Sequence, residues 1–99
     1  MLIISGVIEV NPDNVAAAQT AATAMMEETH KEEGCIVYEF SQVIDAPNRF
    51  RVYEEWRDGP CLKAHSESAH MQVFRSALEE VGVVSRDVFL IKGGEKKPL

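Results

Sequence analysis

Four segments rich in β-branched and aromatic residues alternate with two segments of helical pattern, and this order restricts the fold strongly. Val-, Ile- and aromatic-rich runs are typical of strands, whereas apolar residues at three- and four-residue spacing are typical of helices. The order predicts an α+β fold of the ferredoxin-like βαββαβ type, with both helical regions on one side of a four-stranded antiparallel sheet. The expected strands are residues 2–10, 35–44, 49–56 and 83–91, and the expected helical regions are residues 12–33 and 58–82.

Residues with turn or capping preferences mark the ends of these segments. Asn11-Pro12-Asp13 combines a capping side chain, a proline suited to the first helical turn and an acid near the positive end of the helix dipole. Gly34 stands where a glycine ends a helix, and residues 45–48 (DAPN) have the composition of a hairpin turn. The second helical region should break or bend near residues 66–68. We expect one domain over residues 1–92 and a flexible tail over residues 93–99.

Large apolar residues occupy both faces of the expected strands. In the first strand, Ile4 and Ile8 share one face, and Ile3 and Val7 share the other. Helices on one side can cover only one of these faces, and the second would leave a larger apolar patch than soluble monomers usually expose. The pattern therefore predicts a homodimer whose two sheets face each other about a twofold axis.

The charge balance and the missing motifs exclude several classes of protein. Sixteen acidic and ten basic residues give a formal charge of −6, which argues against nucleic-acid binding. The apolar start is interrupted by Ser5, Gly6 and Glu9 and has no basic flank, so we expect neither a signal peptide nor a membrane span, and a cytoplasmic location. Cys35 and Cys61 lack CxxC spacing and are expected to be free thiols. No nucleotide-binding or serine-hydrolase motif is present.

Three stretches in the middle of the chain carry a resemblance to a known family: Glu33-Gly34-Cys35-x-x-Tyr38, Phe50-x-Val52-Tyr53-Glu54-x-Trp56 and Leu62-x-x-His65-x-x-x-x-His70-x-x-x-Phe74. They resemble the antibiotic biosynthesis monooxygenase domain family, which includes quinol monooxygenases. The resemblance implies a dimeric α+β barrel, and some relatives oxidise phenolic or quinol-type substrates with O₂ and without flavin, haem or metal. Others isomerise or degrade small signalling molecules, cleave haem, or have no established activity, so the family alone does not fix the chemistry.

Glu54, Trp56 and His65 are the candidate catalytic residues. Period-two alternation places Glu54 on an otherwise apolar strand face, where a carboxylate needs a partner. Glu54 can either bind a structural partner or take part in a functional site. Imidazole is the side chain best suited to move a proton near neutral pH, so His65 on the inward face of its helix is the natural base for a phenol or quinol hydroxyl, with Glu54 as a candidate for poising it. The alternative is a buried histidine satisfied by Glu54 or by a backbone carbonyl.

A second group of residues is expected to line the substrate cavity. The aromatic rings of Tyr38, Trp56 and Phe74 would hold the substrate ring, although each is also a plausible core residue. The remaining candidates are Val52 beside Glu54 on the strand, and Leu62 and His70 near His65.

The chain offers little sequence support for a metal site. His65 and His70 are five residues apart, which places them about 140° apart on one continuous helix. A kink near residues 66–68 could bring them together. Because no Asp-x-His or His-x-x-x-His spacing lies nearby, we expect no metal and no other cofactor. His30 is expected at the surface.

These residues support three hypotheses for function. The first is a cofactor-independent monooxygenase that oxidises a small phenolic or quinol-type substrate with O₂ and uses His65 as general base. The second is an isomerase or degrader of a small signalling molecule, which would use the same base without O₂. The third is a non-enzymatic stress-response dimer that binds a small ligand. The haem-degrading relatives rely on an Asn in the first strand and a His further along the second helix, where this chain has Gly6-Val7 and Arg75.

Overall fold

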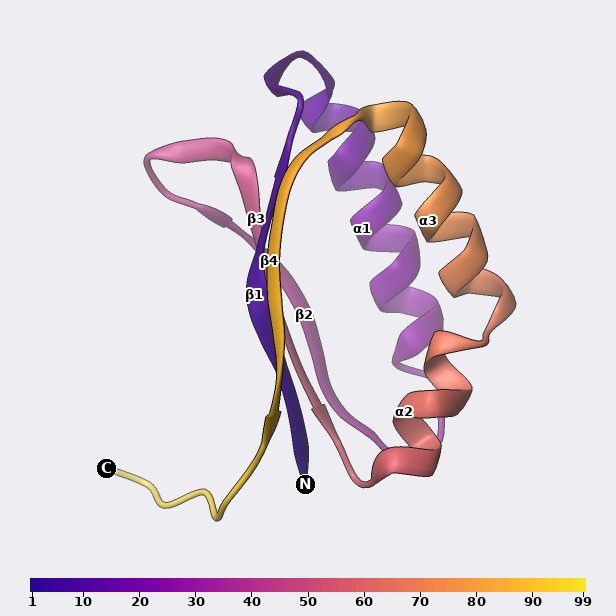
Figure 1. Cartoon of the computed structure of the whole chain (residues 1–99), viewed down its shortest axis with the longest axis vertical. Helices are drawn as coiled ribbons and strands as arrows, with labels where there is room; N and C mark the ends of the chain where they lie inside the picture. Colours follow the sequence, from indigo (N-terminus) through magenta and orange to yellow (C-terminus); the bar gives the residue numbers. More distant parts are fainter.

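The computed structural model covers all 99 residues and contains one sheet with helices on one side of it (Figure 1). The α+β ferredoxin-like fold expected from the sequence is therefore confirmed. The elements are β1 (Leu2–Val10), a short 3-10 helix η1 (Pro12–Asn14), α1 (Val15–Thr29), β2 (Cys35–Val43), β3 (Ala46–Trp56), α2 (Gly59–Ser66), α3 (Ala69–Val81) and β4 (Val83–Lys92).

The sheet has the strand order β2-β3-β1-β4, and all neighbouring strands are antiparallel. β1 and β3 occupy the centre, while β2 and β4 form the two edges. Glu54 on β3 lies opposite Ile4 on β1 and Tyr38 on β2. This register places Glu54 near the end of central strand β3, directly opposite Tyr38 of edge strand β2.

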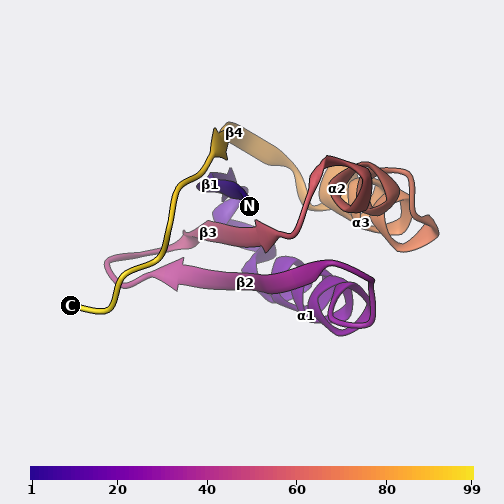
Figure 2. The same ribbon diagram turned by 90° about the horizontal axis from the view of Figure 1, so that it is seen from below.

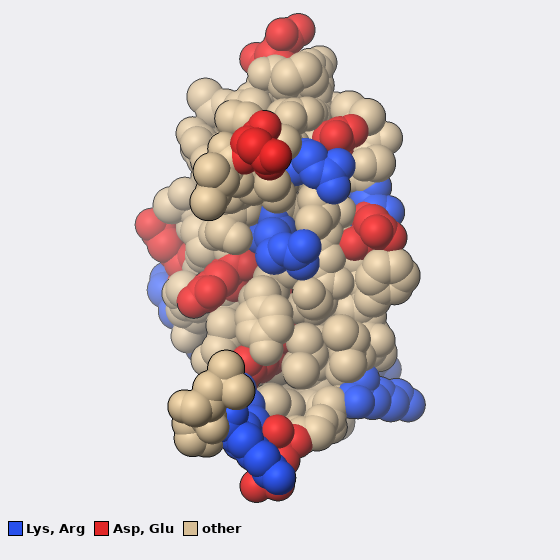
Figure 3. Space-filling view, turned by 90° about the vertical axis from the view of Figure 1, so that its left-hand side faces the viewer, with Lys and Arg blue, Asp and Glu red and all other residues tan.

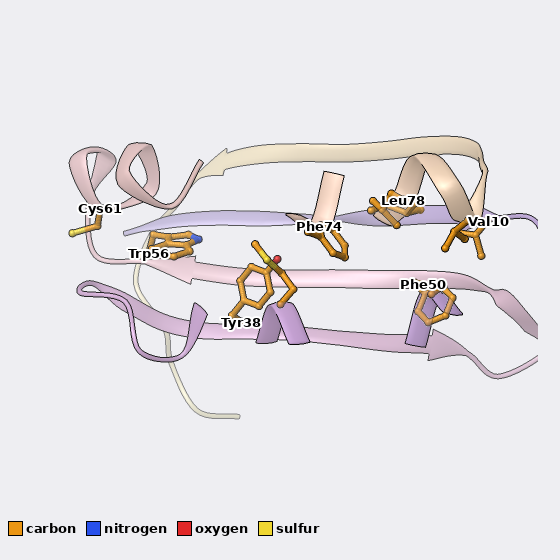
Figure 4. Packing of buried hydrophobic residues seen from close by; sticks show 11 residues of the cluster. Val10, Tyr38, Phe50, Trp56, Cys61, Phe74 and Leu78 are labelled. Carbon is orange, nitrogen blue, oxygen red and sulfur yellow. The ribbon is translucent and has the colours of Figure 1, made fainter. Parts of the chain in front are cut away.

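The helices form one layer over a single face of the sheet, with α1 packed against α3 (Figures 1 and 2). Asn11 caps the short helix η1, because its side chain accepts a hydrogen bond from the Asp13 backbone N–H at 3.0 Å. The α-helix itself begins at Val15, later than the predicted start at residue 12. The core lies between the two layers and joins residues from both (Figure 4). Its largest members are Met25, Tyr38, Phe50, Trp56, Phe74 and Leu78.

Several boundaries differ from the sequence-based expectation. α1 ends at Thr29 rather than near residue 33, and a turn over residues 30–34 leads into β2. Gly34 closes that turn with φ of +77°, a conformation that favours glycine. The hairpin turn is shorter than expected, since β3 already begins at Ala46 and only Ile44 and Asp45 separate the strands. Ala46 pairs with Val43 across the hairpin, which extends the ladder into the predicted turn.

The second face of the sheet carries no helix, and an uncharged area runs between its charged groups (Figure 3). Ile3 lies opposite Ile91 on this face, and the neighbouring Phe89 is 59% exposed. The tail after β4 passes along the same side (Figure 2). There Lys96 forms an ion pair of 2.5 Å with Glu55, a carboxylate that is almost fully buried.

Candidate functional site

A break between α2 and α3 positions the two histidines of the site. Ser68 makes the break, because its hydroxyl donates to the His65 carbonyl oxygen at 2.7 Å and accepts from the Met71 backbone N–H at 3.2 Å. The side chain therefore satisfies the end of α2 and the start of α3 together. The predicted bend near residues 66–68 is present, and it removes the 140° separation that one continuous helix would impose.

His65 is buried between aromatic rings at the end of α2. Its ring centroid lies 4.7 Å from that of Trp56 and 5.3 Å from that of Tyr38. Burial lowers the pKa of His65, and the nearby Glu32 carboxylate opposes that shift only in part. The imidazole is therefore neutral at neutral pH.

Glu32, in the turn after α1, sets the orientation of the His65 ring. The His65 Nδ1 atom lies 3.1 and 3.2 Å from the two carboxylate oxygens of Glu32. A carboxylate can only accept, so Nδ1 carries the proton and Nε2 is left with a free electron pair. The same ring lines an apolar cavity, so Nε2 is the nitrogen available to a molecule bound there.

That cavity has a volume of about 220 Å³ and lies between the helix-covered face of the sheet and helices α2 and α3. Most of its wall is apolar. The predicted residues that line it are Tyr38, Val52, Glu54, Leu62, His65 and Phe74. Arg75 of α3 and Arg86 of β4 add positive charge to the wall.

Glu54 is a buried carboxyl on the cavity wall. Burial raises the pKa of Glu54 to about 7, although a hydrogen bond from Trp56 acts in the opposite direction. Trp56 Nε1 donates that bond to Glu54 Oε1 at 2.8 Å. Near neutral pH the protonated and charged forms of Glu54 therefore coexist, and the protonated form is a hydrogen-bond donor.

Tyr38 contributes a further polar group to the cavity wall. Its ring is almost completely buried, and its hydroxyl forms no hydrogen bond within the chain. Burial and the charges of Glu54 and Glu32 raise the pKa of Tyr38, so the phenol stays protonated. The hydroxyl is thus a donor without an internal acceptor.

Two predicted residues occupy other positions than expected. Trp56 is completely buried and does not line the cavity, because its indole packs against His65 and bonds to Glu54. Trp56 therefore supports the positions of His65 and Glu54 and does not contact a substrate ring. His70 also lies outside the cavity, since the start of α3 turns its Nε2 atom to Glu32 Oε1. His65 itself pairs with Glu32 and not with Glu54, which corrects the expected partner.

The sequence reasoning missed Glu32 and Arg86. Glu32 lies 33 residues before His65, in a polar stretch with other acids, and nothing local distinguishes it. Arg86, in contrast, could have been found from the sequence pattern of its strand. It interrupts the alternating set Val84, Val88 and Leu90 of β4, just as Glu54 interrupts its own strand face.

Glu32, His65 and His70 also form the one group in the structure that could hold a metal ion, since their ligand atoms lie within 4.8 Å of one another. The separation of about 140° would apply only to one continuous helix, and the bend between α2 and α3 brings the two histidines together, as the sequence allowed.

The family profile described as "Antibiotic biosynthesis monooxygenase" matches residues 1–77. The chain belongs to this family. Within the curated proteins, it is 27% identical over 88 residues to "Putative monooxygenase YcnE" of Bacillus subtilis strain 168, covering 89% of this chain and 93% of that protein.

Solved structures of the antibiotic biosynthesis monooxygenase family share the fold. One from Deinococcus radiodurans superposes with a TM-score of 0.92 at 20% identity and covers 100% of this chain and 98% of its own. One from Nitrosomonas europaea has a TM-score of 0.87 at 24% identity and covers 94% of this chain and 98% of its own. No helix of the present structure is both long enough and apolar enough to cross a membrane.

Proposed function

We propose that this protein is a cofactor-independent monooxygenase that oxidises a small hydroquinone or phenol with O₂. The observation that supports this most is the pairing of Glu32 with His65 Nδ1, which leaves Nε2 unprotonated beside an apolar cavity. The family match and the relative named as a monooxygenase support the reaction class.

The cavity volume favours a substrate with a single ring. An apolar cavity of about 150 Å³ is enough for benzene, and the present cavity of about 220 Å³ leaves room for ring oxygens and a short substituent. Drug-sized ligands occupy larger sites of about 300–1,000 Å³. Polycyclic substrates would need the cavity to widen.

In the proposed reaction, His65 Nε2 accepts a proton from a substrate hydroxyl, and the resulting anion is electron-rich enough to reduce O₂. Overall, a hydroquinone and O₂ give a hydroxyquinone and water. One oxygen atom enters the ring, the other leaves as water, and the substrate supplies all four electrons. The protein supplies the base, the orientation and the exclusion of bulk water.

Glu54 and Tyr38 would hold the substrate oxygens. Both line the cavity, and both have a protonated form that can donate near neutral pH. Donors directed at an oxygen that gains negative charge stabilise the anion in a cavity of low dielectric. Arg86 at the cavity wall adds a positive charge that favours the same anion.

The active form would be a homodimer. The helix-free face of the sheet exposes Phe89 and Ile91 by 59% and 47%, and Ile3 lies between them and the centre of the sheet. Pairing two such faces about a twofold axis removes these side chains from water.

The experiment is a screen of single-ring hydroquinones and phenols in an oxygen electrode, followed by mass spectrometry after turnover in isotopically labelled O₂. We expect oxygen uptake and one labelled oxygen atom in the product. Binding of these compounds without oxygen uptake would contradict the proposal and favour the ligand-binding hypothesis. Conversion of a compound under argon would favour an isomerase or degrader.

A further inference from the structure

Three side chains from separate parts of the chain meet at one point on the far side of His65 from the substrate cavity. Glu32 comes from the turn after α1, His65 from the end of α2 and His70 from the start of α3. His65 Nδ1 lies 3.1 Å from one carboxylate oxygen of Glu32, and His70 Nε2 contacts the other. Both histidines thus direct a ring nitrogen to the same carboxylate.

The spacing of these atoms suits a small tetrahedral cation. Zinc ligands lie at about 2.0–2.2 Å from the metal, which puts neighbouring ligand atoms roughly 3.3 Å apart. The Nδ1, Nε2 and carboxylate oxygen atoms of this set all lie within 4.8 Å of one another. A cation between them would require only a modest rearrangement of these side chains.

The surroundings fix two of the ligands and leave one coordination position open. His65 is held between the rings of Trp56 and Tyr38, and Ser68 fixes the angle between α2 and α3. On the outer side, Glu32 and His70 line a second cavity of about 360 Å³. Water there could complete the coordination, as in zinc sites with three protein ligands and an open position.

We propose that Glu32, His65 and His70 form a binding site for Zn²⁺. Two imidazoles and one carboxylate are a ligand set that zinc takes in proteins, and each donor is partly or fully shielded from water here. The site goes beyond the proposed oxygenation and does not depend on it, since binding needs no substrate.

Binding at this site would change the role of His65. A zinc ion on Nδ1 displaces the proton that Glu32 now accepts, so a neutral ring carries its proton on Nε2. Nε2 would then face the substrate cavity as a donor instead of a base. The metal-loaded protein would keep the same substrate cavity, but His65 could no longer accept a proton there.

The test is calorimetric titration of the chelator-dialysed full-length protein with Zn²⁺, together with Co²⁺ titration followed by visible absorption. We expect one Zn²⁺ per chain and the absorption bands of tetrahedral Co²⁺. Loss of a metal ligand's supporting partner alone costs about 10- to 100-fold in affinity, so His70→Gln and Glu32→Gln should each weaken binding by ~100-fold or more.

Two matched variants serve as controls. His30→Gln changes the third histidine, whose Nε2 contacts the Tyr38 carbonyl oxygen, and Glu33→Gln changes the exposed neighbour of Glu32. Both should bind Zn²⁺ like the wild type. Equal affinity in His70→Gln, or no saturable binding by the wild type, would overturn the proposal.

A measurement on the wild type covers the case in which a ligand variant does not fold. Histidine ring signals in NMR spectra should shift on Zn²⁺ addition for His65 and His70 and stay unchanged for His30. Shifts confined to His30, or to none of the three, would also overturn the proposal.

Discussion

Trp56 Nε1 donates a hydrogen bond of 2.8 Å to Glu54 Oε1, two residues earlier on the same face of β3. The indole is completely buried, so this bond satisfies a donor and an acidic acceptor that have little access to water. The hydrogen bond thus joins Glu54, which lines the substrate cavity, to Trp56, which belongs to the hydrophobic core.

Trp56→Phe should therefore affect stability rather than substrate contact. The change removes a buried donor and leaves unfilled space, which together should cost about 2 kcal/mol of unfolding free energy. Urea denaturation followed by circular dichroism measures this. Val73→Ala on the exposed side of α3 is the control and should change stability by less than ~0.5 kcal/mol. A stability loss no larger than that of the control would contradict the role given to Trp56.

Glu54 should make stability depend on pH. Its pKa is raised from 4.5 to about 7 in the folded protein, so the folded state holds this proton more tightly than the unfolded state. The contribution is fully present below pH 4.5 and is lost as pH rises through about 7. At one pKa unit per 1.36 kcal/mol, the loss is about 3 kcal/mol.

Glu54→Gln removes this titration but keeps an acceptor for Trp56. We expect the variant to gain stability relative to wild type between pH 4 and pH 8, by an amount on the order of 3 kcal/mol. Denaturation curves of both proteins at a series of pH values provide the comparison. Parallel pH profiles would show that the carboxyl is not protonated preferentially in the folded state.

The helix-free face of the sheet should make the protein a dimer. Light scattering at micromolar concentration should give twice the chain mass of 11.0 kDa. Phe89→Lys places a charge on this face and should shift the mass to that of one chain, whereas Val73→Lys on exposed helix α3 should not. A single-chain mass for the wild type would contradict the proposed dimer.

Oxygen uptake should need no added cofactor. Activity should survive dialysis against a chelator, and the active protein should show no visible absorption band. Added Zn²⁺ should lower the activity of the wild type but not that of His70→Gln, because His70 is a proposed metal ligand outside the substrate cavity. Activity that appears only after addition of a metal or flavin would contradict the cofactor-independent reaction.

The architecture could be predicted because its determinants are local. Apolar residues specified the strands, Asn11 caps the short helix η1, and Gly82 ends α3 with positive φ. Gly34 also has positive φ, but it closes the turn after α1 instead of ending that helix. The sequence predicts the hairpin turn over residues 45–48, because Pro47 and Asn48 favour turns. Both residues instead belong to β3. The strand pairing between β2 and β3 outweighed the turn preference of Pro47 and Asn48.

The site could be predicted only in part, because its polar contacts join distant segments. Glu54 stood out as an acid on an apolar face, and His65 as a histidine on an inward face, and both line the cavity. The link from Glu32 to His65 depends on the turn after α1 meeting the end of α2, a contact over 33 residues that no spacing reveals. The position of His70 depends on the angle set by Ser68.

The rate of oxygen uptake by His65→Gln tests the central claim most directly. Glutamine retains much of the volume and hydrogen bonding of histidine but cannot act as a base at neutral pH, and His30→Gln provides the same substitution outside the cavity. We predict that His65→Gln lowers kcat by ~10²-fold or more, the scale of general-base assistance, while His30→Gln keeps the wild-type rate. Full turnover by a folded His65→Gln variant would contradict the assignment of His65 as the base.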